Sequence, residues 1–492
     1  MRSGLPRGIV PSMDKSSRTI GWPLLWASLL LVFWFTRIWA LDAFPPFVDE
    51  GVHLAFGELV QNQGALARAE EGRQFTIWLF VAAQAQRSGD PLFTARVATL
   101  LVVLPGIAAA VGTARLLANR WSGVLAALLL TFSTYLFFFD RLALADPFAA
   151  SAIGVSIYFG ARLRVRTHAV DALLCGFALF IAVGAKLSAL PYLVVPVVAA
   201  VTLKSPGSTW RDNVRWAIVA LLCAGGLIGV YFAVTFLKGS NPLFHMVNPG
   251  SLGQGSPWKN LQLALDTMQG YAGTIMAILV LASVPLLVLR RKFYLPLVLL
   301  IPFIPLLLSS RNESRYFLPP MGILLVCGAV ATGYINRRYT PLFQRLSLTI
   351  ILIWIALVWF PFAAALIQDP AALPLPDRDR GQYITSDASG FGLAEARAVL
   401  VSEEAEWVIG LLANCQSLKA LAADLDVNCP RLNPNGEDVP ALEALLEASQ
   451  LPGIYVVLED LPYAPASSPG QLIAEIEGAP GRPLLRVYAL GE

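Results

Sequence analysis

The sequence predicts a polytopic α-helical membrane protein with a small α/β domain at its C-terminal end. Hydrophobic residues fill 56% of the 492 positions and charged residues only 14%, against roughly 25% charged in an average soluble domain. From Asp369 onward the composition changes, with 7 Lys/Arg and 19 Asp/Glu, whereas the preceding part has 29 and 14. A basic apolar part followed by an acidic polar part indicates two bodies in two compartments.

Eleven apolar stretches are long enough to cross about 30 Å of hydrocarbon. A twelfth stretch, 74–87, is shorter and ends in Gln84, Gln86 and Arg87, so we expect a helix that lies at the membrane interface. The eleven predicted spans are 20–40, 92–114, 121–139, 145–161, 169–185, 187–203, 214–237, 271–289, 293–309, 317–335 and 347–367.

Loop charges set the predicted orientation, because cytoplasmic loops carry an excess of Lys and Arg. The basic tail 1–19 is then cytoplasmic, the body 20–367 crosses the plasma (inner) membrane, and 368–492 is extracytoplasmic. The first span has a basic flank like a signal peptide, but its length and the lack of a small-residue cleavage site favour a retained anchor. The inner connections all contain basic residues: Arg115 and Arg120, Arg162 to Arg166, Lys204 to Arg215, Arg290 to Lys292, and Arg337 to Arg345.

The C-terminal part alternates strand-like and helix-like patterns, which predicts an α/β domain. Expected strands are Trp407–Leu412, Ile454–Leu458 and Leu484–Ala489, and expected helices are 393–400 and 440–448. Cys415 and Cys429 both lie in this outer part. A disulfide is permitted in that compartment, but sequence alone does not decide whether these two cysteines pair.

Ionisable residues at a membrane boundary are candidates for function, and the first group follows the first span. Asp49, Glu50 and His53 lie there in the sequence Phe47-Val48-Asp49-Glu50-Gly51-Val52-His53. Capping of the following helix explains one acid. It does not explain two acids with a histidine one turn later, so we expect Asp49 and Glu50 to be catalytic and His53 to bind substrate.

The second group follows the third span, in Asp140-Arg141-Leu142-Ala143-Leu144-Ala145-Asp146-Pro147. Asp146 precedes a proline and an apolar span, a pattern that is also typical of a helix cap. Asp140 and Arg141 can equally be interface anchors. The predicted topology places Asp146 in the same compartment as Asp49, so we expect a catalytic role for Asp146 and substrate binding by Arg141.

Two further groups supply positive charge at the outer face. Lys186 interrupts a long apolar run at a tight turn, where it either snorkels or meets an anionic head group. Arg311, Arg315 and Tyr316 open a late span; arginine suits a phosphate ligand, and an Arg/Tyr interface anchor is the alternative. The long outer loop 238–270, which contains His245, has the length of a functional loop, and we expect His245 to bind substrate.

The ordered motifs resemble the GT-C superfamily of integral-membrane glycosyltransferases. They are an Asp-Glu pair in the first outer loop, Arg-x4-Asp-Pro, Gly-Ala-Lys, and Arg-x3-Arg-Tyr-x-Leu-Pro. They are most similar to the branch with protein O-mannosyltransferases and the aminoarabinose transferase of lipid A, over about 20–367. The resemblance implies inverting transfer of mannose or a related sugar from a polyprenyl-phosphate donor at the outer face, with membrane lipid and a lipid-linked sugar as partners. The acceptor hydroxyl or phosphate stays open, and no nucleic-acid partner is implied.

The resemblance assigns the first-loop acid to Asp49, the second-loop acid to Asp146, and the donor-phosphate cations to Lys186 and Arg315. The chemistry agrees, because glycosyl transfer needs a base for the acceptor proton and cations for the leaving phosphate. A carboxylate at the membrane boundary can have a raised pKa, which would make Asp49 a better base. Asp49 and Asp146 could also hold Mg²⁺ or Mn²⁺. Lys and Arg could instead supply the positive charge that such an ion would provide.

Two other classes remain as alternatives. A secondary transporter or flippase for a lipid-linked or anionic substrate would also carry membrane charges, but at mid-span, with broken helices and a pseudo-repeat. The charges here cluster at the outer ends of spans, and no repeat is visible. A sensor or scaffold that uses the acidic tail as a binding module is the third class.

Overall fold

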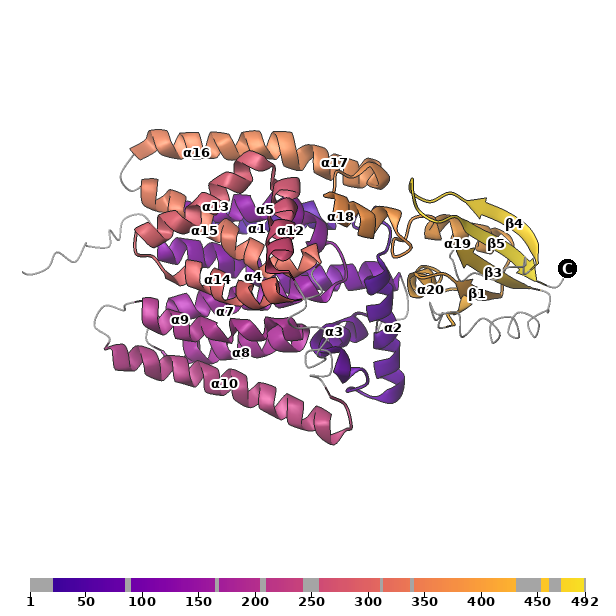
Figure 1. Ribbon diagram of the computed structural model, residues 1–492, viewed down its shortest axis with the longest axis horizontal. Helices are drawn as coiled ribbons and strands as arrows, with labels where there is room; N and C mark the ends of the chain where they lie inside the picture. Colours follow the sequence, from indigo (N-terminus) through magenta and orange to yellow (C-terminus); the bar gives the residue numbers. More distant parts are fainter. Residues whose placement is uncertain are drawn as a thin grey trace, which may run out of the picture.

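A computed structural model describes residues 21–84, 90–163, 168–203, 209–241, 256–309, 313–336, 340–430, 453–459 and 470–490. The predicted tail 1–19, the predicted helix 440–448, and the site candidates His245 and Arg311 lie outside these residues. A helical body forms one end of the molecule and a small sheet domain the other, with α2 and α20 between them (Figure 1).

Helices cover the whole apolar part of the described chain. The body contains α1 (Gly21–Ile38), α2 (Val48–Gln63), η1 (Ala69–Glu71), α3 (Gln74–Gln84), α4 (Pro91–Leu117), α5 (Arg120–Thr131), α6 (Thr134–Asp140), α7 (Ala145–Arg162), α8 (Ala169–Ala185), η2 (Leu187–Val194), α9 (Val195–Thr202), α10 (Trp210–Leu237), α12 (Pro257–Ala272), α13 (Thr274–Leu289), α14 (Tyr294–Leu308), η3 (Ser314–Phe317), α15 (Leu318–Asn336), α16 (Thr340–Trp354), η4 (Ile355–Trp359) and α17 (Phe360–Gln368).

Each of the eleven stretches predicted to cross the membrane contains helix. Four helical segments of the described chain are long and apolar enough to cross a membrane, or up to six if each of two bent pairs counts as one span. Large apolar side chains such as Leu222, Val230 and Leu237 of α10 are exposed, as expected for a lipid-facing helix. The chain is therefore an integral membrane protein, and the count of eleven spans stays a prediction.

One predicted span differs in shape from a single rod. The stretch 121–139 is broken between α5 and α6, which are bent by 61°, because the Ser133 side chain accepts a hydrogen bond from Leu136 N and starts a new helix. The helices α13 and α14, which correspond to the separate predicted spans 271–289 and 293–309, are bent by 117° at the basic turn between them.

Two short helices follow the first span. The helix α2 covers Val48 to Gln63, and the described part of the predicted interfacial helix 74–87 forms α3. The prediction of a structureless loop over 238–270 is wrong for its second half, where Ser256 caps α12. That signal, a serine followed by proline at the first helical position, is present in the sequence.

The C-terminal domain is a five-stranded mixed sheet in the order β2-β1-β3-β5-β4. The strands are β1 (Trp407–Leu411), β2 (Asp426–Asn428), β3 (Ile454–Glu459), β4 (Gln471–Ile476) and β5 (Leu485–Leu490), with helices α19 (Leu393–Ser402) and α20 (Cys415–Leu421). β1 pairs in parallel with β2 and β3, and β5 pairs antiparallel with β3 and β4. The three expected strands and the expected helix 393–400 are present, whereas β2 and β4 were not anticipated.

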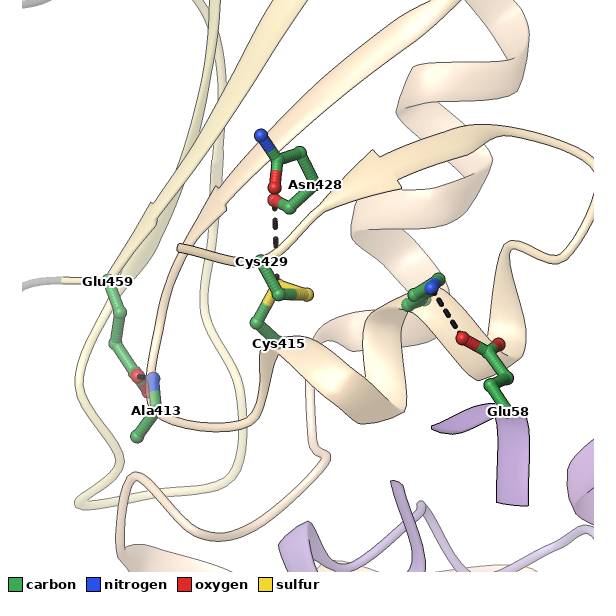
Figure 2. Close-up of a disulfide and its surroundings, with 7 residues drawn as sticks. Glu58, Ala413, Cys415, Asn428, Cys429 and Glu459 are labelled. Carbon is green, nitrogen blue, oxygen red and sulfur yellow. Dashed lines mark hydrogen bonds and ion pairs between the residues drawn. A yellow bond between two sulfur atoms is a disulfide. The ribbon is translucent and has the colours of Figure 1, made fainter. Parts of the chain in front are cut away.

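Between the body and this sheet, the segment 370–391 packs into the helical core rather than into the domain. It includes η5 (Pro370–Ala372), α18 (Asp377–Arg380) and η6 (Gly381–Thr385), and the buried Leu373, Leu375 and Tyr383 belong to the core of the body. The separate core of the C-terminal domain begins at Leu393. Cys415 and Cys429 form a disulfide within that domain (Figure 2).

Candidate active site

Two acid–cation pairs lie at helix ends of the body. Asp49 Oδ2 is 2.6 Å from Arg315 Nη1, and Asp146 Oδ1 accepts a hydrogen bond from Lys186 Nζ at 2.5 Å. In each pair one member is reachable, since Asp49 exposes 26% of its side chain and Lys186 exposes 21%. The four residues come from four separate places in the sequence, and the fold makes them two adjacent pairs.

The ring of Tyr316 joins the two pairs. Lys186 Nζ lies 4.0 Å from its centroid, and the Arg315 guanidinium lies 5.7 Å from it, both within the range of cation–π attraction. The charges of both Asp49 and Asp146 also act on Arg315. Asp49, Asp146, Lys186, Arg315 and Tyr316 thus form one cluster, which we call the rim cluster.

Local structure explains how each charge reaches this cluster. Asp49 is in the first turn of α2 and Asp146 in the first turn of α7, where the helix dipole favours an acid. Lys186 sits in extended backbone between α8 and η2. Arg315 lies in η3, a short turn that directly precedes α15. Neighbouring helix ends therefore deliver all four side chains.

Glu50, predicted to be catalytic, is instead a fully buried anchor. Its carboxylate accepts two hydrogen bonds from Arg96, at 2.8 Å each, one from Ala143 N at 2.7 Å and one from Phe47 N at 2.9 Å. Its side chain is 0% exposed. These four bonds use the acceptor capacity of the carboxylate, so Glu50 fixes the start of α2 to α4 and to the loop before α7.

His53 is buried near Asp49 and Arg315 and contacts Arg73. Arg73 was not among the site residues predicted from the sequence. His53 Nδ1 lies 3.0 Å from Ala143 O, and Arg73 Nη1 lies 2.9 Å from His53 Nε2. A neutral ring that donates from Nδ1 and accepts at Nε2 satisfies both contacts. Because His53 is 1% exposed, it orients Arg73 rather than contacting substrate. Arg73 is half-buried, and its charge acts on Asp49.

The expectation of a raised pKa for Asp49 is wrong for this arrangement. Burial alone raises that pKa, but the charge of Arg315, aided by His53, Arg73 and Lys186, outweighs burial and holds the pKa of Asp49 below its usual 3.8. Asp49 is therefore ionised at neutral pH, as a base must be. Its basicity would rise when a ligand draws Arg315 away.

The environment of His53 predicts a loss of stability in acid. Burial, and after it the charge of Arg73, lowers the pKa of His53 from 6.5 to about 4. Since the folded-state pKa lies below the unfolded value, the neutral ring contributes stability above pH 6.5 that is lost as the pH falls toward 4. We expect this one group to cost on the order of 2 kcal/mol at pH 5.

Thermal unfolding in detergent at pH 7.5, 6.5, 5.5 and 4.5 measures this effect. The midpoint of wild-type protein should fall more steeply with acid than that of His53→Gln. Parallel slopes for the two proteins would show that His53 is not the titrating group.

Arg141, predicted to bind substrate, is also structural. Its side chain is buried and donates to Arg37 O at 2.7 Å, to Trp39 O at 2.8 Å and to Ala40 O. It therefore caps the end of α1. Asp140 pairs with Arg37, with 3.7 Å between Oδ2 and Nε. Carbonyls at a helix end bind cations well, which explains why an arginine is needed there.

The two rim carboxylates do not form a metal-binding set. Among the residues that the structure describes, no group of three His, Cys, Asp or Glu side chains is arranged to hold a metal ion. Asp49 and Asp146 each face a cation instead, and Mg²⁺ or Mn²⁺ there would meet Arg315 and Lys186 at close range. The residues do not fit a divalent ion, and we derive no step through one.

An apolar cavity of about 70 Å³ lies within the helical body. It is bounded by α4, α7, α14 and α15, and it includes Pro147, which follows Asp146, and Leu318, two residues after Tyr316. Its walls extend along the helices to Thr113 and Ile157 and are largely apolar. The cavity reaches Pro147 and Leu318, and so it adjoins the segments that carry Asp146 and Tyr316.

The chain is an integral membrane protein whose fold is similar to that of GT-C glycosyltransferases, and it carries a cluster of charged residues at the ends of several helices. ArnT from Cupriavidus metallidurans, solved with bound undecaprenyl phosphate, is similar over 95% of this chain and 98% of its own, with a TM-score of 0.63 and 15% identity. Its apo state gives the same score. The resemblance that the motifs gave is confirmed at the level of fold.

Two other glycosyltransferases share the helical architecture. The oligosaccharyltransferase of Archaeoglobus fulgidus, in complex with Zn and sulfate, has a TM-score of 0.52 at 12% identity over 88% of this chain and 67% of its own. The arabinofuranosyltransferase AftD from Mycobacteria has 0.51 at 15% identity, over 96% of this chain and 41% of its own. No protein-family profile and no curated protein sequence matches the chain.

Proposed function

We propose that the protein is an inverting glycosyltransferase that moves a sugar, mannose or a related one, from a polyprenyl-phosphate donor to an acceptor at the outer face of the plasma (inner) membrane. The observation that carries this proposal is the rim cluster itself, a reachable acid and a reachable cation beside an apolar cavity. A lipid-linked sugar has matching parts, which are an apolar tail, a phosphate and a reactive anomeric carbon.

Each part of the donor has a proposed partner. The prenyl tail takes the apolar cavity, where burial of each CH₂ contributes about 0.8 kcal/mol. The phosphate meets Lys186 and Arg315. Arg73 adds positive charge nearby, because its charge, like those of Lys186 and Arg315, acts on Asp49. The ring of Tyr316, already in contact with both cations, would cover the sugar–phosphate junction. The similar structure solved with bound undecaprenyl phosphate supports a lipid phosphate as the ligand class.

The reaction would be a single displacement. The acceptor oxygen attacks the anomeric carbon while the bond from that carbon to the phosphate oxygen breaks, so the configuration inverts. Polyprenyl phosphate leaves with the bonding electrons, and Lys186 and Arg315 stabilise its added charge. With a hydroxyl acceptor, Asp49 takes the proton. As Arg315 turns from Asp49 to the phosphate, Asp49 loses its counter-ion and becomes a stronger base at the moment when the proton must leave.

Asp146 would keep Lys186 in place, because its 2.5 Å contact fixes the ammonium next to Tyr316. An alternative function as a transporter or flippase gains some support from the two bent helix pairs. The charges that define the site nevertheless sit at helix ends, and the similar structures are transferases. We therefore favour transfer.

A donor panel tests the proposal. Purified protein in liposomes is incubated with radiolabelled undecaprenyl-phosphate mannose, glucose, arabinose or aminoarabinose and an extract of cell-envelope lipids and glycans. We expect one donor to lose its label to an acceptor in an Asp49-dependent manner. Movement of intact donor across the bilayer, without transfer of label, would establish the flippase instead.

Loss of Lys186 should weaken binding of the donor phosphate. In Lys186→Ala we expect the KM for the donor and the Kd for undecaprenyl phosphate to rise by about 10- to 100-fold, because a charge-assisted contact contributes roughly 1.5–3 kcal/mol. The acceptor KM should change less than threefold. Lys259→Ala, on the exposed start of α12, is the matched control. An unchanged donor KM would show that Lys186 only snorkels and does not bind the donor phosphate.

A further inference from the structure

The N-terminus of α2, which carries Asp49, is held by the chain that follows the last helix of the body. Val48 N donates to Ala388 O at 3.0 Å. The Asn414 side chain donates from Nδ2 to Pro46 O at 3.2 Å and to Ala388 O at 3.1 Å. Asn414 is 0% exposed, so a single amide joins the two backbone segments that flank the start of α2.

Helix α20 continues the contact along α2. Ser417 Oγ donates to Phe47 O at 3.3 Å. A Cβ at Gly51 would lie 2.4 Å from Ser417 N, so glycine is needed for the two helices to approach this closely. Farther along, Lys419 Nζ donates to Glu58 Oε2 at 2.7 Å (Figure 2). Three turns of α2 are therefore fixed by one short helix of the C-terminal domain.

The short helix is itself tied to the sheet. Its first residue, Cys415, is bonded to Cys429, which directly follows β2. Figure 2 shows this disulfide beside the loop that leads from β1 into α20, with the contact to Glu58 at the far end of the helix. The covalent link prevents α20 from moving away from the domain, and so it also limits movement of α2.

The other member of the Asp49–Arg315 pair is held by the same part of the chain. Asp379, in α18, accepts a hydrogen bond from Ser314 Oγ on one oxygen and from Tyr271 Oη on the other, the latter at 2.7 Å. Ser314 directly precedes Arg315. Asp379 is 1% exposed, and its contacts fix η3 against α12.

From these contacts we infer that the chain beyond α17 is a positioning element for the catalytic pair. Asn414 and Ser417 hold the helix that presents Asp49, while Asp379 holds the turn that presents Arg315. This inference rests on the proposed function for its catalytic consequence, but the positioning itself is a physical property that can be measured without turnover. The C-terminal domain would thus belong to the active site without contacting the substrate.

Hydrogen–deuterium exchange of Asn414→Asp tests the positioning. The new carboxylate faces the carbonyls of Pro46 and Ala388 and donates to neither, so α2 amides over 48–54 should exchange at least about tenfold faster. Asn428→Asp, an exposed asparagine of the same domain, is the control and should exchange like wild type. Ser417→Ala, compared with Ser402→Ala on α19, repeats the test with a smaller change. Unchanged exchange in α2 for both Asn414→Asp and Ser417→Ala would overturn the inference.

Kinetics then separate positioning from general damage. In Asn414→Asp, kcat should fall about 10- to 100-fold, because a misplacement of about 1 Å at a reacting group has that effect. The Kd for undecaprenyl phosphate, whose cations lie on other elements, should stay within twofold of wild type. Faster α2 exchange with an unchanged kcat would overturn the catalytic part of the inference. Absence of transfer by wild type would instead count against the proposed function, while the exchange experiment would still decide the positioning.

Discussion

Asp49→Asn should reduce kcat by about 10³-fold while the protein still folds and binds undecaprenyl phosphate. The amide keeps the size of the side chain but cannot accept the acceptor's proton, and a positioned base contributes roughly 10²–10⁴-fold. The loss of charge also removes the counter-ion of Arg315 in the free enzyme. Arg315 is then free for the donor phosphate, so we expect lipid binding to stay equal or to tighten.

The measurement is turnover with the donor found in the panel, together with the Kd for undecaprenyl phosphate. Glu70→Gln, in the same outer loop and about one-third exposed, controls for loss of a nearby carboxylate and should retain wild-type rates. Normal turnover by Asp49→Asn would remove the base from the proposed mechanism. A loss of lipid binding equal to the loss of turnover would show that the variant is misfolded or that Asp49 contacts the donor.

The rim cluster could be predicted because its signal is local. Each of Asp49, Asp146, Lys186 and Arg315 is a charge at the outer end of an apolar span, and such charges are rare unless they are paired or functional. Once sidedness was set by the loop charges, the four had to share one face. The pairing of Asp49 with Arg315 and of Asp146 with Lys186 could not be predicted, because it depends on how the helix ends approach one another.

The structural roles of Glu50 and Arg141 were missed for the opposite reason. The partners of Glu50 include Arg96 and Ala143, 46 and 93 residues away. Those of Arg141 are carbonyls more than 100 residues earlier. A buried ion pair and a helix cap between distant elements leave no periodic or motif signal. In the sequence, Glu50 therefore cannot be distinguished from Asp49 as a candidate for function, nor Arg141 from Asp146.

Contacts across domains are hidden in the same way. Asn414 and Asp379 lie in a part of the chain whose composition indicates an ordinary soluble domain, yet their side chains reach the body. Arg73 was missed because it follows a glycine in a polar loop with other charges. Its contact with His53 and its action on Asp49 become visible only in the folded structure.

Substitution of Glu50 should lower stability, whereas substitution of its neighbour Asp49 should lower turnover. The contrast tests whether Glu50 is a structural anchor and Asp49 the catalytic base. In Glu50→Gln the charge of Arg96, which is 1% exposed, loses its counter-ion. The amide can also no longer accept all four hydrogen bonds. Breaking one side of a buried pair costs about 3–5 kcal/mol, so we expect a large fall in the thermal midpoint or loss of folded protein on extraction.

The double variant Glu50→Met/Arg96→Met identifies the cause, because replacing both partners by apolar groups of similar size removes the stranded charge. We expect it to be more stable than Glu50→Gln, although the N–H groups of Phe47 and Ala143 lose an acceptor and three carbonyls before α2 lose the Arg96 donor. Unfolding in detergent, followed by size-exclusion chromatography, measures both. If Glu50→Gln instead keeps wild-type stability and loses turnover, Glu50 acts in the chemistry, and the assignment of the base to Asp49 alone is wrong.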